Sequence, residues 1–145
     1  MTKYKYSSWM AAFILGLGIM SYKPVKEAIM TKPVEQAFTL AIYKDLDYSS
    51  AAYNSTYAQV HITVEKLNGS KSIVELDTTF DNQLLKNYPT IENAQLQKVT
   101  IPNVFANKEE VIVTYVLTYN SNGSLLQMQN SKVLKNENEH LNIGI

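Results

Sequence analysis

Residues 33–46 read PVEQAFTLAIYKDL, and the structure of this stretch decides between two folds. Val34, Phe38 and Ile42, together with Ala37 and Ala41, recur at the spacing of one helix face, and the proline at the first position suits a first helical turn. The alternation of Phe38, Leu40 and Ile42 is equally what a strand would show. Because fourteen residues is long for a strand, the sequence predicts a helix.

The stretch 57–66 predicts a strand, because its apolar residues alternate strictly with polar ones. A Leu-Asn-Gly turn follows, and residues 70–78 return as a second strand. If the turn contains three residues, with its glycine left-handed, Ile62 lies opposite Val74 and apolar residues pair with apolar ones. A two-residue Asn-Gly turn would instead set Ile62 opposite Glu75, so the three-residue turn is the prediction.

The clearest strand in the chain is 110–119, which reads EVIVTYVLTY, and residues 125–129 can add a fourth strand after a turn. Residues 81–87 form a short helix in this interpretation, with an aspartate as its N-cap and a proline after its end. The predicted fold is therefore α+β, with a small, mostly antiparallel sheet of three to four strands packed against two helices. The alternative is an all-β sandwich in which residues 33–46 form a strand.

The composition excludes several classes of function. The 145 residues include 13 lysines, no arginine, 13 acidic residues, two histidines and no cysteine. A balanced charge with no basic run argues against nucleic-acid binding, and the absence of cysteine removes disulfides and thiolate chemistry. The histidines are isolated and no Gly-x-Ser-x-Gly motif occurs. We therefore expect neither an enzyme nor a bound metal or cofactor.

The N-terminus has the pattern of an export signal. Two lysines precede an apolar run from Trp9 to Met20, which is too short to cross a bilayer as a helix. We predict a signal peptide over 1–21, a linker over 22–32 and a single domain over 33–145. The protein would then be periplasmic or extracellular. The alternative is an uncleaved N-terminal anchor in the inner membrane.

The order of features over residues 37–120 is similar to the C-terminal domain of the TonB energy transducers. The resemblance lies in a helix followed by the strand Val60-x-Ile62-x-Val64, and then in a hairpin whose turn is Leu-Asn-Gly. A serine follows Tyr48 where the family has proline, and the long proline-rich spacer of a transducer is missing. The resemblance implies a stand-alone exported module. It would capture an extended peptide of a cell-envelope partner, such as an outer-membrane receptor segment, by strand addition.

In that family the last strand receives the peptide, and tyrosines are common at binding surfaces. The resemblance and the tyrosine pattern together predict a partner-binding region. It consists of Val111, Val113, Tyr115, Leu117, Tyr119, Tyr48 and Tyr57. A second hypothesis is a structural or adhesin-like β-sandwich domain without a specific peptide ligand.

Overall fold

The computed structural model describes residues 32–135 and 138–145. The predicted signal peptide, and all but the last residue of the predicted linker, lie outside these residues. No helix in the described part of the chain combines the length and the apolar character needed to span a membrane.

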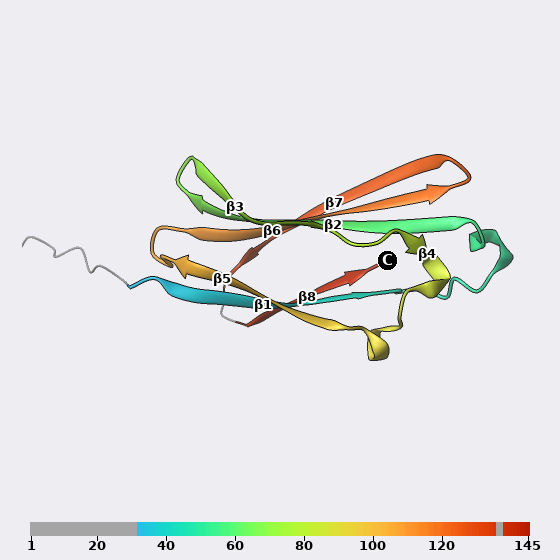
Figure 1. Ribbon diagram of the computed structural model, residues 1–145, viewed down its shortest axis with the longest axis horizontal. Helices are drawn as coiled ribbons and strands as arrows, with labels where there is room; N and C mark the ends of the chain where they lie inside the picture. Colours follow the sequence, from blue (N-terminus) through green and yellow to red (C-terminus); the bar gives the residue numbers. More distant parts are fainter. Residues whose placement is uncertain (1–31, 136–137) are drawn as a thin grey trace, which may run out of the picture. The chain divides into compact units, whose positions relative to one another are not determined.

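Two sheets face each other in two layers (Figure 1). The first sheet has three strands in the order β5-β1-β8, in which β1 pairs antiparallel with β5 and parallel with β8. Because β1 lies in the middle, both edges of its backbone are hydrogen-bonded. The strands are β1 (Val34–Tyr43), β5 (Leu96–Val104) and β8 (Glu139–Gly144).

The second sheet has five strands. Four of them follow the order β3-β2-β6-β7, and the short β4 also pairs with β2. Three 3₁₀ turns connect the strands. The strands are β2 (Thr56–Asn68), β3 (Lys71–Thr79), β4 (Gln83–Leu84), β6 (Glu110–Ser121) and β7 (Ser124–Leu134). The 3₁₀ turns are η1 (Ala51–Tyr53), η2 (Leu85–Asn87) and η3 (Ile91–Asn93).

The α+β prediction is wrong, because the predicted helix over 33–46 is the central strand β1. Both faces of β1 are buried. Phe38 and Leu40 point into the core, while Ala37 and Ala41 are covered on the other face. Burial on both faces creates apolar residues at helical spacing in a strand, and this explains the false signal. The second predicted helix, 81–87, is also absent, and β4 and the single turn η2 occupy it.

The core lies between the two sheets. Its side chains alternate along each strand with residues that face outward, as the pleat of a sandwich requires. The strand β8, which follows the polar tail of the sequence, adds Leu141 and Ile143 to this core. The largest fully buried side chains are Phe38, Ile62, Ile101, Ile143, Ile145, Val60, Val64, Val104, Val111 and Val113.

The β2–β3 hairpin has a different register from the predicted one. Ile62 pairs with Thr78 rather than Val74, and Val64 pairs with Leu76. The turn has two residues and begins with Gly69, whose φ is 59°, as in a type II′ turn. A β-bulge after Val64 restores the alignment of apolar residues that the short turn alone would lose.

The turn predicted after residue 119 and the strand predicted to follow it are both confirmed. Asn122 and Gly123 have φ values of 50° and 87°, which is the geometry of a two-residue type I′ turn. The strand expected over 125–129 is present and extends to eleven residues as β7. Pro102 lies in β5, which is an edge strand, where a residue without an N–H is tolerated.

Candidate functional site

The predicted strand-addition region lies on β6, and the backbone of β6 has no free edge. The strand pairs with β2 over 110–121 and with β7 over 111–121. The side chains of Val111, Val113 and Leu117 are buried in the core. These residues therefore hold the sandwich together, and a peptide that pairs with this sheet must approach one of its outer strands, such as β3 or β7, instead.

The predicted tyrosines occupy different surroundings. Tyr57 is 41% exposed, whereas Tyr115 and Tyr119 pack against the core and are partly buried. Burial is the main reason why the pKa of Tyr119 is raised, with a smaller contribution from the charge of Asp45. The structure does not gather these side chains into one surface.

Tyr48 is a buried anchor rather than a surface residue. Its hydroxyl donates to the main-chain oxygen of Ile145 at 2.5 Å, and it lies 3.2 Å from Oδ1 of Asp45. The ring of Tyr53 meets it edge-on, with 5.1 Å between the centroids. Burial, followed by the nearby Asp45 carboxylate, raises the pKa of Tyr48 to about 12. The residue therefore fastens the loop after β1 to the end of β8.

We expect Tyr48→Phe to change how stability depends on alkaline pH. Between pH 10 and about 12 the unfolded chain releases the tyrosine proton before the folded chain does, so the free energy of unfolding falls as the pH rises. The phenylalanine variant lacks this decline and is less stable by about 1 kcal/mol at neutral pH. Urea unfolding at several pH values measures both effects. Tyr57→Phe is the matched control. A Tyr48→Phe variant that follows the wild-type slope would contradict the prediction.

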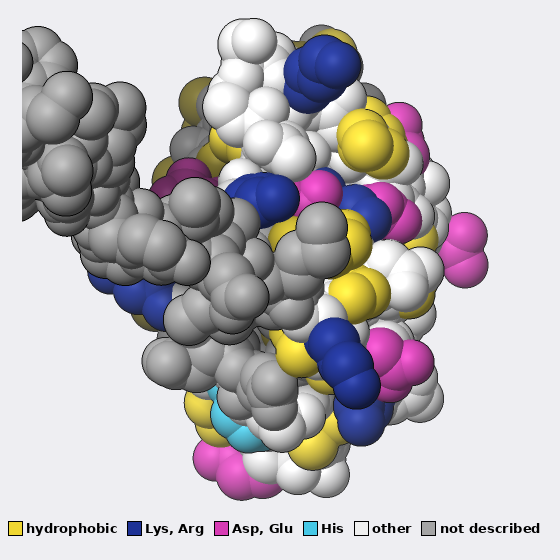
Figure 2. All heavy atoms as spheres, turned by 90° about the vertical axis from the view of Figure 1, so that its left-hand side faces the viewer, with side chains coloured by type: hydrophobic (Ala, Val, Ile, Leu, Met, Phe, Trp, Pro, Cys, Tyr) yellow, Lys and Arg dark blue, Asp and Glu magenta, His cyan; other side chains and the backbone are white. Residues whose placement is uncertain are grey.

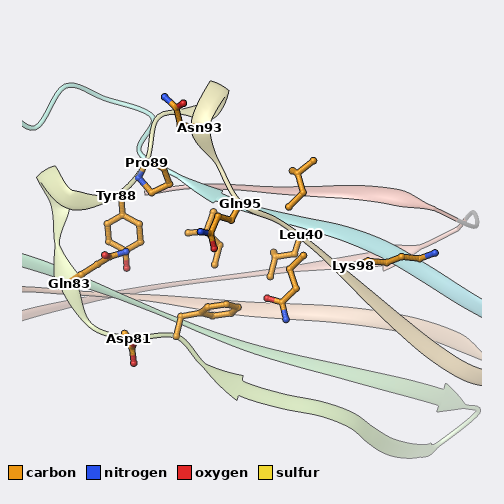
Figure 3. A pocket seen from close by; sticks show the side chains of 12 residues that line it. Leu40, Asp81, Gln83, Tyr88, Pro89, Asn93, Gln95 and Lys98 are labelled. Atoms are coloured by element: carbon orange, nitrogen blue, oxygen red, sulfur yellow. The ribbon is translucent and has the colours of Figure 1, made fainter.

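A groove of about 790 Å³ lies between the two sheets on the side of β5 (Figure 3). Leu40 and Ile42 of β1 form part of its floor, together with Phe80, Tyr88 and Pro89 from the segment that follows β3. The polar residues that line it are Asp81, Gln83, Asn93, Gln95, Gln97 and Lys98. Figure 3 shows the side chains of Gln83, Tyr88 and Gln95 turned toward one another.

Two hydrogen bonds hold the segment that forms one wall of this groove. The buried Tyr88 hydroxyl donates to the carbonyl oxygen of Ala58 at 2.9 Å. The main-chain N–H of Lys44 donates to the carbonyl oxygen of Pro89 at 2.8 Å. Burial is the main cause of the raised pKa of Tyr88. The first bond connects this segment to β2 of the five-stranded sheet, and the second connects it to the residue that follows β1 of the three-stranded sheet.

The lining suits a neutral, polar ligand. Four carboxamides supply both donors and acceptors, and the single carboxylate and single ammonium group balance each other. An apolar floor with a few polar groups at the rim is common in sites for small molecules. Sequence reasoning missed the groove, because its lining combines residues 40–42 with residues 80–98, which lie far apart in the sequence.

In the part of the chain that the structure describes, no group of three or more histidines and acidic residues that could hold a metal ion comes together. His61 lies on the surface of β2, where it contacts Thr79 at 2.7 Å and Asp77 at 3.2 Å. On the face drawn in Figure 2, lysine and acidic side chains lie next to one another rather than in patches of one sign.

No family model, no curated protein and no solved structure matches this chain. The resemblance to TonB therefore remains a prediction from the sequence.

Proposed function

We propose that this chain is a non-catalytic, adhesin-like structural module of an exported protein. Its described part is an all-β sandwich, which is the fold that the second sequence hypothesis requires. The helix required by the peptide-capture hypothesis is the strand β1, and the strand assigned to capture is paired on both sides. Both facts favour the structural hypothesis.

The observation that carries the proposal is the parallel pairing of β1 with β8. Six residue pairs join the two strands, from Phe38 with Glu139 to Tyr43 with Gly144. Tension between the start of β1 and the end of β8 acts along these strands in opposite directions. All the hydrogen bonds between them then resist together, instead of opening one after another. Such a geometry suits a module that transmits force.

Single-molecule pulling tests this proposal. Because the chain has no cysteine, handles can be attached at Lys32→Cys and at a cysteine added after Ile145. We expect a higher unfolding force than with handles at Glu110→Cys and Lys135→Cys, which flank the open end of the β6–β7 hairpin and peel it pair by pair. Equal forces in the two geometries would overturn the proposal.

The groove favours a second, adhesive function, which is to bind a short neutral saccharide. Its carboxamides match the hydroxyl groups of a sugar, and its floor matches the apolar face of a sugar ring. NMR titration with maltose, lactose and cellobiose should shift amides of residues 80–98. We expect Gln95→Ala to weaken binding about five- to tenfold, since it removes one hydrogen-bonding group.

The matched control for this titration is Gln129→Ala, which removes an exposed glutamine outside the groove. It should leave the affinity unchanged. If none of the three sugars shifts groove amides, or if both variants weaken binding equally, the saccharide proposal is wrong. The pulling result does not depend on this outcome.

A further inference from the structure

One edge of the sandwich is unprotected. Four strands lie at the outer ends of the two strand orders, namely β3, β5, β7 and β8. Exposed edges attract other strands, and proteins protect them with charges, prolines, bulges or short length. Such protections are present in β3 (Lys71, Glu75, Asp77), in β5 (Lys98, Pro102) and in the six-residue β8 (Glu139). Residues 124–131 of β7 read SLLQMQNS and contain none of them.

The same edge also exposes large apolar side chains. Leu126 is 59% exposed and Met128 is 54% exposed. They pair with Tyr119 and Leu117 of β6 and so lie on the core-facing side of the sheet. The three-stranded sheet leaves them uncovered, which gives the edge an apolar stripe beside its free backbone groups.

The turn before β7 determines which backbone groups are free. In a two-residue hairpin the residues that flank the turn, here Ser121 and Ser124, exchange hydrogen bonds, and the pairs alternate from there. Leu125, Gln127 and Gln129 therefore fall in the pairs without hydrogen bonds. Their N–H and C=O groups point away from β6, toward the open edge.

We propose that β7 pairs antiparallel with β7 of a second copy of this chain, about a two-fold axis at Gln127. In this register Gln127 exchanges two hydrogen bonds with its own counterpart, and Leu125 pairs with Gln129 of the second copy. Leu126 then lies opposite Met128 of the second copy, on both sides of the axis. Two apolar pairs meet on the core-facing side, and the two five-stranded sheets become one continuous sheet.

Charge supports a second copy as the occupant. The paired segment, 124–130, carries no charge, so two identical edges meet without repulsion. The nearest cation, Lys132, lies beyond the paired segment and binds Oε2 of Glu139 at 2.8 Å. A register shifted by two residues would place Leu126 opposite Leu126 of the second copy, or opposite its Asn130. In either register Leu126 no longer lies directly opposite Met128 of the second copy. This inference is independent of the proposed function.

Sedimentation across a range of protein concentrations tests the dimer. We expect a concentration-dependent dimer whose dissociation constant rises at least about tenfold in Gln127→Pro, since proline removes the N–H that faces the second copy in both chains. The substituted N–H makes no bond to β6, so the variant should stay folded by circular dichroism. Leu126→Lys should also weaken the dimer, whereas Leu96→Lys, at a 68% exposed position on β5, should not. A monomer at every concentration would overturn the proposal.

Cysteine cross-linking tests the register separately. In the proposed pairing the Cα atoms of the two Gln127 residues are about 5.5 Å apart, which is within disulfide reach. The two Leu125 residues are roughly 13 Å apart. Under mild oxidation Gln127→Cys should give a covalent dimer much faster than Leu125→Cys, which lies on the same face of the same edge. Equal rates for the two variants would show that the proposed register is wrong.

Discussion

Replacing Phe38 with alanine should lower the free energy of unfolding by about 3–5 kcal/mol. Phe38 is fully buried in the middle of β1, and core residues from both sheets surround it. The substitution removes a large apolar surface and leaves a cavity, which the two sheets cannot close without disturbing their pairing. Urea unfolding followed by circular dichroism and tyrosine fluorescence measures the loss.

Phe105→Ala is the control for this prediction, since Phe105 follows β5 and is 37% exposed. It should cost no more than about 1 kcal/mol. If Phe38→Ala costs as little as the control, the packing described for β1 is incorrect.

The second large effect concerns the ion pair between Lys66 and Glu75, which joins β2 to the bulge in β3. Nζ of Lys66 lies 2.7 Å from Oε1 of Glu75, and the side chains are only 11% and 19% exposed. Lys66→Met leaves the largely buried Glu75 carboxylate without its counter-charge. We expect a loss of about 1–3 kcal/mol, which is smaller than for a fully buried pair because water still reaches both groups.

A double-mutant cycle separates the ion pair from the packing. Lys66→Met combined with Glu75→Leu removes both charges, so the double variant should be more stable than the Lys66→Met single variant. Urea unfolding of the four proteins gives the coupling energy. Strictly additive losses would mean that the bulge, and not the ion pair, stabilises this hairpin.

Local patterns predicted the strands that are buried on one face. The alternation around Val60 and Ile62, and the one that runs from Val111 to Tyr119, each predict a strand that the structure contains. The Asn-Gly pair at 122–123 likewise forms the turn between two strands. In each case the signal depends only on neighbours in the sequence, which is why it could be recognised there.

The errors arose where distant residues decide the structure. Ala37 and Ala41 are buried, and β1 is a central strand because it pairs with two strands that come much later in the chain, which no local pattern records. The hairpin register depends on the bulge beside Glu75, which a count of turn residues does not reveal. The prediction of a binding role for Tyr48 likewise could not anticipate that its hydroxyl binds Ile145, 97 residues away.

The position of β1 also determines when the domain can fold. Its two neighbours are β5 and β8, which begin at Leu96 and Glu139, so neither edge of β1 can pair before β5 has been synthesised, and its second edge stays free until β8 follows. The β2–β3 and β6–β7 hairpins can form early, because their partners are adjacent in sequence. The three-stranded sheet has to wait for contacts across about a hundred residues, which are slow to form. During synthesis the core between the two sheets therefore stays incomplete until residues 139–144, which supply Leu141 and Ile143, have been added.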